Sequence, residues 1–301
     1  MNQAGGRKSD IFGIIETSMS GMSKGQKAIA RFIVTNYEKA AHYTAAKIAA
    51  ETDVSESTVV RFASELGFEG FPEFQKKLRE DLKVKLTSVE RLNTSVYTGL
   101  NGNVVKTVIK SDIAKLENTL SAFDYESFNK ACDMIMSANR LFILGVRSSA
   151  PLAAFLGFYF NLMFDNVRLV HTTSVSEMFE QVMNVRKGDV VIGISFPRYS
   201  KRTIRAMQFC RDSGAEVIAI TDKPDNPISS SSDCALLAPS DMASFVDSLV
   251  APLSLINALL AELGNRNKSV VTETFSKLER IWDDYGVYDK GDSEGNTSNE
   301  L

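Results

Sequence analysis

A change in the spacing of apolar residues divides this sequence and constrains its fold more than any other feature. From residue 24 to about residue 82 the apolar positions recur with helical spacing, and no strand is expected there. Two further helical stretches, at 104–120 and 125–137, then precede a series of short apolar runs. These runs are residues 140–144, 167–170, 190–194, 217–221 and 234–238. Strand-like runs that are apolar on both faces and alternate with helices predict a parallel, doubly wound α/β sheet.

The length of 301 residues favours two domains. With 44% apolar and 24% charged residues, the chain can bury a substantial core. We expect an all-α domain at 1–85, a linker rich in Ser, Thr, Asn and Gly at 86–103, an α/β domain at 104–286, and a disordered acidic tail at 287–301.

The first ten residues, MNQAGGRKSD, lack the apolar core of a secretory signal, and no apolar stretch is long enough to span a bilayer. We therefore expect a cytoplasmic protein. The three cysteines, Cys132, Cys210 and Cys234, are far apart and each lies in an apolar segment. They indicate buried thiols rather than disulfides or a metal site, and we expect no cofactor.

Charge alone does not indicate a nucleic-acid partner. Residues 1–85 carry 13 Lys and Arg against 11 Asp and Glu, whereas residues 279–301 carry 2 against 7. Phosphate binding normally needs a concentrated basic face. A DNA-binding function must therefore be argued from the residue pattern.

Within the helical region, residues 45–51 predict a helix, residues 52–54 a turn, and Ser55 the N-cap of a second helix. The spacing turns Ile48, Ala49, Val54, Val59, Phe62 and Leu66 inward and leaves Glu56, Ser57, Thr58, Arg61 and Ser64 outside. Short polar side chains followed by an arginine suit a recognition helix in a major groove. Periodicity alone fits a plain helical hairpin equally well.

The segment from Ser23 to Leu78 resembles the amino-terminal DNA-binding domain of RpiR-type bacterial transcription regulators. We expect either a winged or a plain helix-turn-helix. The resemblance rests on the core Ser55-x-x-Thr58-Val59-Val60-Arg61-Phe62, on Leu66-Gly67-Phe68 and on Gly70-Phe71-x-x-Phe74. It implies that Ser55, Glu56, Ser57, Thr58 and Arg61 face DNA. Arg61 has an alternative role as the partner of Glu65 four residues later. Lys24, Lys27 and Arg31 share a helical face that either touches phosphate or is simply solvated.

Two strand-to-helix junctions in the α/β region are rich in hydroxyl groups. Gly145 follows the first strand and Ser148-Ser149 open a helix, while Ser195 ends the third strand and Ser200 precedes a helix. Helix N-termini at the carboxyl edge of a parallel sheet bind anions, and nearby cations add donors. The cations here are Arg147, Arg198, Lys201 and Arg202. A serine at a helix start is also a common N-cap, so the pairing of the two loops is what favours a ligand site.

Residues 124–264 resemble the SIS (sugar isomerase) domain, which binds phosphosugars and commonly follows the RpiR-type helix-turn-helix. Gly145 and Ser149 match the family's Gly-x-Gly-x-Ser, with Arg147 in place of a glycine. Ser195 and Ser200 match the outer hydroxyls of Ser-x-Ser-Gly-x-Thr, with Pro197 and Arg198 as departures. The predicted ligand-binding residues are Gly145, Arg147, Ser148, Ser149, Ser195, Arg198 and Ser200. The departures leave open a sugar phosphate, a carboxylated compound or an unphosphorylated one.

Taken together, the resemblances imply a homodimeric transcriptional regulator that binds operator DNA and senses a sugar phosphate or related anion, without catalysing a reaction. The rival is an aldose-ketose phosphosugar isomerase with a helical assembly domain. His171 and Glu177 lie where related isomerases place an acid or base, but they fit a loop residue and a helix-start acid as well. The chain has only 2 His, and no second acid is expected beside the serine loops. A third class, a metabolite-binding protein that does not bind DNA, would leave the helix-turn-helix unexplained.

Overall fold

The computed structural model describes residues 11–85, 103–171, 174–240 and 246–288. Contacts group the chain into two compact units, Met1–Ser111 with Asp241–Ser248, and Asp112–Ser240 with Leu249–Leu301. The predicted linker lies outside the described residues except for Asn103, and so does the predicted tail from residue 289 onward.

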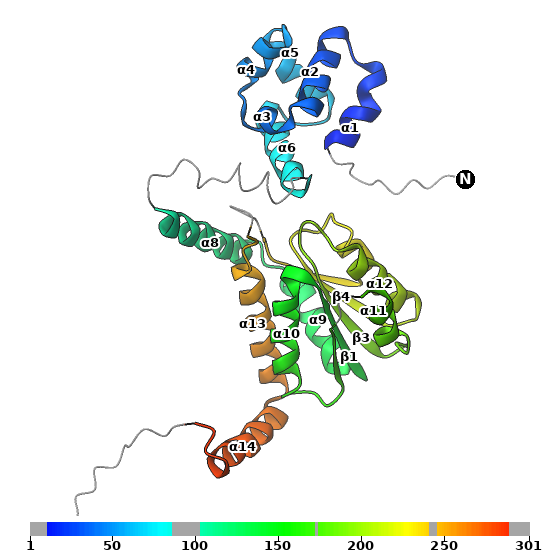
Figure 1. Ribbon diagram of the computed structural model, residues 1–301, viewed down its shortest axis with the longest axis vertical. Helices are drawn as coiled ribbons and strands as arrows, with labels where there is room; N and C mark the ends of the chain where they lie inside the picture. The colour runs from blue at the N-terminus through cyan, green and yellow to red at the C-terminus, as the bar shows by residue number, and fades with distance from the viewer. Residues whose placement is uncertain (1–10, 86–102, 172–173, 241–245, 289–301) are drawn as a thin grey trace, which may run out of the picture. The chain divides into compact units, whose positions relative to one another are not determined.

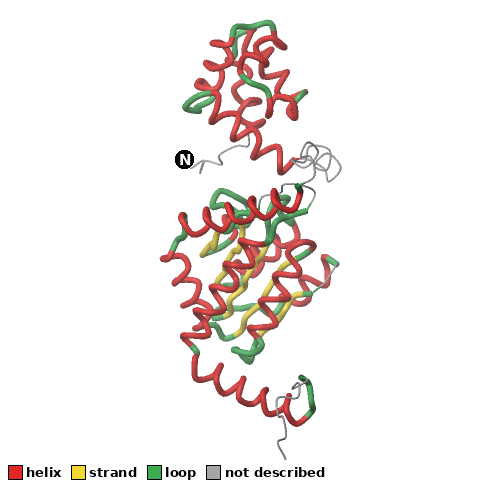
Figure 2. Tube along the Cα trace, turned by 90° about the vertical axis from the view of Figure 1, so that its left-hand side faces the viewer, coloured by secondary structure: helices red, strands yellow, loops and turns green. Residues whose placement is uncertain are grey.

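The amino-terminal part is helical. Its helices are α1 (Ile11–Ser18), a 3-10 turn (Met19–Gly21), α2 (Lys24–Thr35), α3 (Tyr37–His42), α4 (Ala45–Thr52), α5 (Glu56–Glu65) and α6 (Phe71–Lys85). No strand occurs among residues 11–85 (Figure 2). The all-α prediction is therefore confirmed, and no wing of strands accompanies the helix-turn-helix within residues 11–85.

Side-chain caps begin the helices α2, α4 and α5, and the cap at Ser55 was predicted. Ser23 and Gln26 form a reciprocal capping box at α2, and the hydroxyls of Thr44 and Ser55 accept backbone hydrogen bonds at the starts of α4 and α5. One apolar cluster holds these helices together, and Phe62 and Phe74 are among its fully buried members, in edge-to-face contact.

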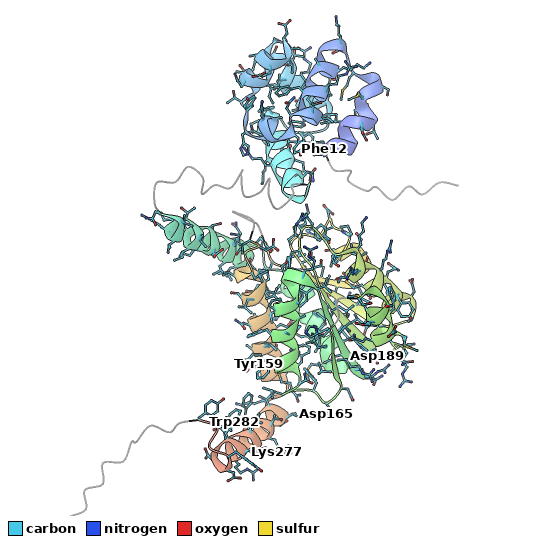
Figure 3. The ribbon with its side chains drawn as sticks, viewed as in Figure 1. Phe12, Tyr159, Asp165, Asp189, Lys277 and Trp282 are labelled. Carbon is cyan, nitrogen blue, oxygen red and sulfur yellow. The ribbon has the colours of Figure 1, made fainter. Side chains whose placement is uncertain are left out.

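Helix α1 was not predicted from the sequence. Ile11, Phe12 and Ile15 are buried in the same cluster; Phe12 is labelled in Figure 3. The backbone N–H of Ile11 donates to the buried carboxylate of Asp81 on α6 at 2.7 Å, and Lys77 pairs with the same carboxylate at 2.9 Å. The helix start is thus satisfied by a residue 70 positions away.

The second unit contains a five-stranded sheet in the order β2-β1-β3-β4-β5, with every neighbouring pair parallel. The strands are β1 (Arg140–Gly145), β2 (Val167–Val170), β3 (Asp189–Ile194), β4 (Glu216–Thr221) and β5 (Cys234–Leu237). All five predicted strands are present within one residue at either end, and the predicted doubly wound parallel sheet is confirmed.

Helices cover both faces of this sheet (Figure 1). The helices of this part of the chain are α8 (Val104–Ser121), α9 (Tyr125–Ser137), α10 (Ala150–Phe160), α11 (Val175–Val182), α12 (Lys201–Asp212), α13 (Val250–Arg266) and α14 (Lys268–Asp284), with 3-10 turns at Arg147–Ser149 and Ser229–Ser231. Helices α9, α10 and α13 lie on one face of the sheet and α11 and α12 on the other, while α14 packs against α13. Alternate strand residues point to opposite faces. Leu141 and Ile143 pack with α9, α10 and α13, while Phe142 and Leu144 pack with α11 and α12.

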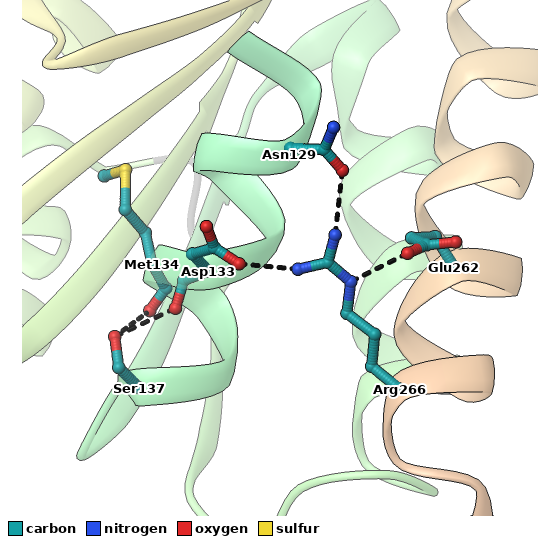
Figure 4. A network of polar contacts seen from close by, with 6 residues as sticks. All are labelled: Asn129, Asp133, Met134, Ser137, Glu262 and Arg266. Carbon is teal, nitrogen blue, oxygen red and sulfur yellow. Dashed lines mark hydrogen bonds and ion pairs between the residues drawn. The ribbon is translucent and has the colours of Figure 1, made fainter. Parts of the chain in front are cut away.

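Charged groups tie elements of this unit together. Arg266 of α13 donates to Asp133 at 2.6 Å and to Asn129 at 2.8 Å, both on α9, and to Glu262 at 2.7 Å (Figure 4). Arg140 at the start of β1 forms a two-pronged pair with the fully buried Asp189 of β3. In the described part of the chain, no helix is long and apolar enough to cross a membrane.

Candidate functional site

The second helix of the helix-turn-helix, α5, presents the predicted DNA-facing residues on its outer side. Ser55, Glu56, Ser57 and Arg61 are exposed and Thr58 is half-buried. The hydroxyl of Ser55 lies 2.8 Å from those of both Ser57 and Thr58, and it accepts the backbone N–H of Thr58 at 3.3 Å. The predicted cap is confirmed, and the helix start carries a connected row of hydroxyls.

In the structure Arg61 does not pair with Glu65, the alternative role that the sequence allowed. Glu65 instead accepts a hydrogen bond from the buried amide of Gln26 on α2. No ion pair joins Arg61 to an acidic side chain among the residues described. This leaves the guanidinium available for an external contact and fixes α5 against α2.

Val60, also on α5, was not predicted to face outward. Its side chain is 41% exposed beside Arg61, although valine normally packs inward. An apolar contact of this kind matches a thymine methyl group in a major groove. On α2, Lys24 and Arg31 are exposed and Lys27 is half-buried, which leaves both interpretations of that basic face open.

In the sheet, the two hydroxyl loops follow strands that are hydrogen-bonded neighbours. Gly145 at the end of β1 pairs in register with Ile194 at the end of β3, so the two loops leave the sheet at the same level. The helices after these strands, α10 and α12, cover opposite faces. This is the topological switch point, where open α/β sheets bind ligands.

Close packing fixes the first loop. A Cβ on Gly145 would lie 2.8 Å from the carbonyl oxygen of Ser149 and 2.8 Å from the Cβ of Ala153, so only glycine fits there. Arg147, where the family pattern has glycine, is in the left-handed region with φ 57°. The loop therefore keeps the backbone shape that the family glycine would favour.

Ser148 is exposed and Ser149 is buried at 4% exposure. Ser149 occupies the N-cap position of α10, but its hydroxyl makes no capping bond and no other hydrogen bond with any described residue. Capping therefore does not engage the Ser149 hydroxyl, which keeps its donor and acceptor capacity.

In the second loop, hydroxyl acceptors hold the backbone. The Oγ of Ser195, a residue 4% exposed, accepts the N–H of Ser200 at 3.1 Å, and the Oγ of Ser200 accepts the N–H of Thr203 at 3.3 Å. Both hydroxyls accept from the backbone, so their protons remain for an outside acceptor. Arg198 is exposed in the same loop, as are Lys201 and Arg202 at the start of α12.

A polar cluster that was not predicted from the sequence lies at this edge of the sheet. The phenol of Tyr199 donates to the Asp222 carboxylate at 2.8 Å, and Asn226 donates to Thr221 at 3.0 Å and to Asp222 at 3.3 Å. Burial raises the pKa of both Tyr199 and Asp222. The expectation that no second acid lies near the serine loops was wrong, because β4 brings Asp222 beside the loop after β3.

Thr203 was also missed. It lies in the first turn of α12, is fully buried, and its hydroxyl has no hydrogen-bond partner among the described residues. His171 is exposed after β2, with its backbone N–H donating to Gln181, and Glu177 is exposed in the first turn of α11. The structure does not bring these two residues into the polar cluster around Tyr199 and Asp222.

A cavity of about 340 Å³ lies at the opposite edge of the sheet, next to the start of β1 and lined in part by Asn139, Asn161, Asn166 and Asn267. It is separate from the hydroxyl loops. The three cysteines are buried as predicted, and burial raises the thiol pKa of Cys132 to about 11 and that of Cys210 to about 12. No group of potential metal ligands occurs among the residues that the structure describes.

Comparison with known proteins gives two family matches. Residues 10–85 match the helix-turn-helix domain of the rpiR family, and residues 134–262 match the SIS domain. HexR of Escherichia coli, an HTH-type transcriptional regulator, is 29% identical over 69% of this chain and 70% of its own length. An HTH-type transcriptional regulator of Caldanaerobacter subterraneus is 24% identical over 90% of this chain and 96% of its own length.

Two solved structures are similar. The sugar isomerase domain of the RpiR transcription factor from Sphaerobacter thermophilus has 25% identity and a TM-score of 0.56, covering 59% of this chain and 98% of that one. The Vibrio vulnificus NanR protein complexed with ManNAc-6P has 21% identity and a TM-score of 0.56, covering 90% of this chain and 98% of that one. With a helix-turn-helix domain of the rpiR family at its amino end and a SIS domain at its carboxyl end, the chain belongs to the RpiR-type transcriptional regulators.

Proposed function

We propose that this regulator binds operator DNA through α5 and senses a sugar phosphate or a related anionic metabolite at the hydroxyl loops after β1 and β3. The observation that carries the proposal is the placement of Ser149, Ser195 and Ser200 at adjacent strand ends of the switch point. NanR, a protein of the same fold, is complexed with ManNAc-6P, which supports this class of ligand.

The proposal assigns DNA binding to residues 1–85, a linker to 86–103, the effector domain to 104–286 and the tail to 287–301. The protein acts in the cytoplasm as a homodimer, because two recognition helices reading two half-sites give affinity that one helix lacks. Sensing rather than turnover is proposed, because His171 is exposed and the Asp222 carboxylate is already engaged by Tyr199 and Asn226.

At the DNA site, Arg61→Ala is expected to weaken binding to the cognate operator by about 1 to 3 kcal/mol, and binding to random DNA much less, if the guanidinium reads a base. Fluorescence anisotropy with both DNAs measures the difference. Arg79→Ala is the control, because Arg79 is exposed on α6 and donates to Gln75 four residues before it. Equal weakening of binding to both DNAs would indicate that Arg61 contacts a phosphate rather than a base. If the wild-type protein does not bind its own promoter region, the regulator proposal is wrong.

At the ligand site, Ser149→Ala is the cleanest test, because the lost hydroxyl makes no hydrogen bond with any described residue. Calorimetry against a panel of sugar phosphates is expected to find one binder whose affinity falls by about 1 to 3 kcal/mol in Ser149→Ala, and similarly in Ser195→Ala. Ser213→Ala, at the other end of α12, is the control and should bind like wild type. If only unphosphorylated sugars bind, the phosphate assignment is wrong, and turnover of the bound compound would favour the isomerase.

A further inference from the structure

The two hydroxyl loops lie in parts of the sequence that carry positive charge and no acid. Residues 141–164, which include the first loop and α10, contain Arg147 and no Asp or Glu. Residues 190–205, which include the second loop and the start of α12, also contain no Asp or Glu, and their basic residues are Arg198, Lys201, Arg202 and Arg205. Because the whole chain has a net charge of −3, this positive charge is a local feature of the loops.

Arg147, in the first loop, has a guanidinium that no neighbour engages. The residue is exposed, and among the described residues its side chain makes no hydrogen bond and no ion pair. The carboxylate that β4 brings to this edge of the sheet, that of Asp222, accepts hydrogen bonds from Tyr199 and Asn226 instead. The charge of Arg147 is therefore available to a ligand.

The backbone conformation at position 147 favours glycine rather than arginine. Its φ of 57° lies in the left-handed region, which glycine adopts freely and which side chains other than those of Asn, Asp and His rarely adopt. The guanidinium gives the fold no hydrogen bond or ion pair in return within the described part of the chain. A ligand that binds the guanidinium supplies a reason for an arginine at this position.

We propose that the effector is a sugar phosphate with a second acidic group, and that Arg147 binds this second group. The inference rests on the proposed function, in which the hydroxyls of Ser149, Ser195 and Ser200 bind the phosphate, and it narrows the class of ligand. A guanidinium binds a carboxylate or a phosphate through two parallel N–H bonds. Either group is therefore a suitable partner for Arg147.

The two loops are close enough to share one small ligand. Gly145 pairs in register with Ile194, and strands β1 and β3 are neighbours in the sheet (Figure 1). Neighbouring strands lie about 4.8 Å apart. Ser195 directly follows Ile194, and Arg147 lies two positions after Gly145. One molecule of the size of a sugar therefore spans both loops.

The balance of charge supports two acidic groups. A phosphate carries a charge of about −1.5 to −2 at pH 7. Lys201 and Arg202, both exposed at the start of α12, supply positive charge for it directly after Ser200. Arg147 and Arg198, also exposed, add further positive charge in the loops. A second acidic group gives this excess a partner, and charge complementarity of this kind sets specificity between ligands.

The test is calorimetry of the full-length protein with pairs of compounds that differ by one acidic group. Glucose 6-phosphate is compared with 6-phosphogluconate, which adds a carboxylate, and fructose 6-phosphate with fructose 1,6-bisphosphate, which adds a phosphate. The same comparison is made for any other sugar phosphate that binds. In wild type, the doubly acidic member of at least one pair is expected to bind roughly 10-fold or more tightly than its partner, as for a hydrogen bond between charged groups.

Arg147→Gly is expected to abolish most of this preference. It should not lower the melting temperature Tm, because glycine suits the left-handed backbone at this position. Ser195→Ala should weaken binding of both members of a pair by a similar factor, since both carry the phosphate. Arg280→Ala, which removes a positive charge from an exposed side chain on α14, is the control for net charge and should keep the wild-type preference.

Three results would overturn the inference and leave the sugar-phosphate site in place. They are equal affinity of wild type for both members of every pair that binds, an unchanged preference in Arg147→Gly, and an equal loss of preference in Arg280→Ala. If no sugar phosphate of any kind binds wild type, the ligand class of the proposed function is wrong, and this inference is wrong with it.

Discussion

Replacing Asp189 by alanine is expected to lower the free energy of unfolding of the α/β unit by roughly 3 to 5 kcal/mol, because it leaves one partner of a buried ion pair behind. Asp189 is fully buried at the start of β3. Its carboxylate accepts from Arg140 Nε at 3.0 Å and from an Arg140 terminal nitrogen at 2.5 Å, and from the backbone N–H of Arg186 at 2.9 Å. Since the Arg140 side chain is 19% exposed and is partly hydrated, we expect the lower end of this range.

The loss of unfolding free energy is measured by urea denaturation. Unfolding is monitored by circular dichroism and by the fluorescence of the single tryptophan, Trp282 of α14, which lies in the same unit. Arg211→Ala is the matched control. It removes the Arg211–Asp233 pair, whose side chains are 40% and 30% exposed, and exposed pairs contribute only about 0 to 1 kcal/mol. A loss in Asp189→Ala no larger than that in Arg211→Ala would contradict the prediction.

The Asp189 carboxylate is also expected to make the stability of the fold depend on pH. Burial raises the pKa of Asp189, but hydrogen bonds from Arg140 and from the Arg186 N–H outweigh it and hold the pKa below its usual value of 3.8. A group with a lowered folded-state pKa stabilises the fold above its unfolded pKa, and that contribution is lost as the pH falls through the folded value. The difference in stability between wild type and Asp189→Ala should therefore be full at neutral pH and shrink below pH 3.8.

Local signals account for the elements that the sequence predicted well. The N-cap at Ser55 and the five strands depend on side chains within a few residues of each boundary, and these predictions are confirmed. Helix α1 was missed because its start is satisfied by Asp81, a contact that spacing cannot reveal. Long-range partners of this kind become visible only when the fold is known.

The candidate site shows the same division. Adjacency of the two serine loops follows from parallel strand order, which the pattern of strands and helices supports. The conformation of Ser149 does not follow from sequence: it occupies the N-cap position of α10, but its backbone is helical, with φ −85° and ψ −13°, and its side chain makes no capping hydrogen bond. The Tyr199–Asp222 pair forms because β4 lies next to β3. Its two members are 23 residues apart in the sequence, so no local sequence pattern predicts their contact.

The binding of effector is expected to change operator affinity by roughly 5- to 150-fold, which corresponds to a coupling free energy of about 1 to 3 kcal/mol. The residues of α5 that are proposed to face DNA and the hydroxyl loops lie in different units of the chain. A metabolite can therefore alter DNA binding only if two states of the regulator bind the metabolite with different free energies. The proposed homodimer would provide such states, because its two recognition helices must match half-sites about one turn of DNA apart.

Titration of labelled operator with and without saturating effector measures this factor, and thermodynamic linkage requires that the operator change effector affinity by the same factor. Ser149→Ala is the decisive variant, because it is expected to keep wild-type operator binding without effector and to lose the response to effector concentrations that saturate wild type. Ser213→Ala should keep both. If the operator curve of the wild type is identical with and without a compound that calorimetry shows to be bound, that compound is not the signal, and binding at the hydroxyl loops is not coupled to DNA.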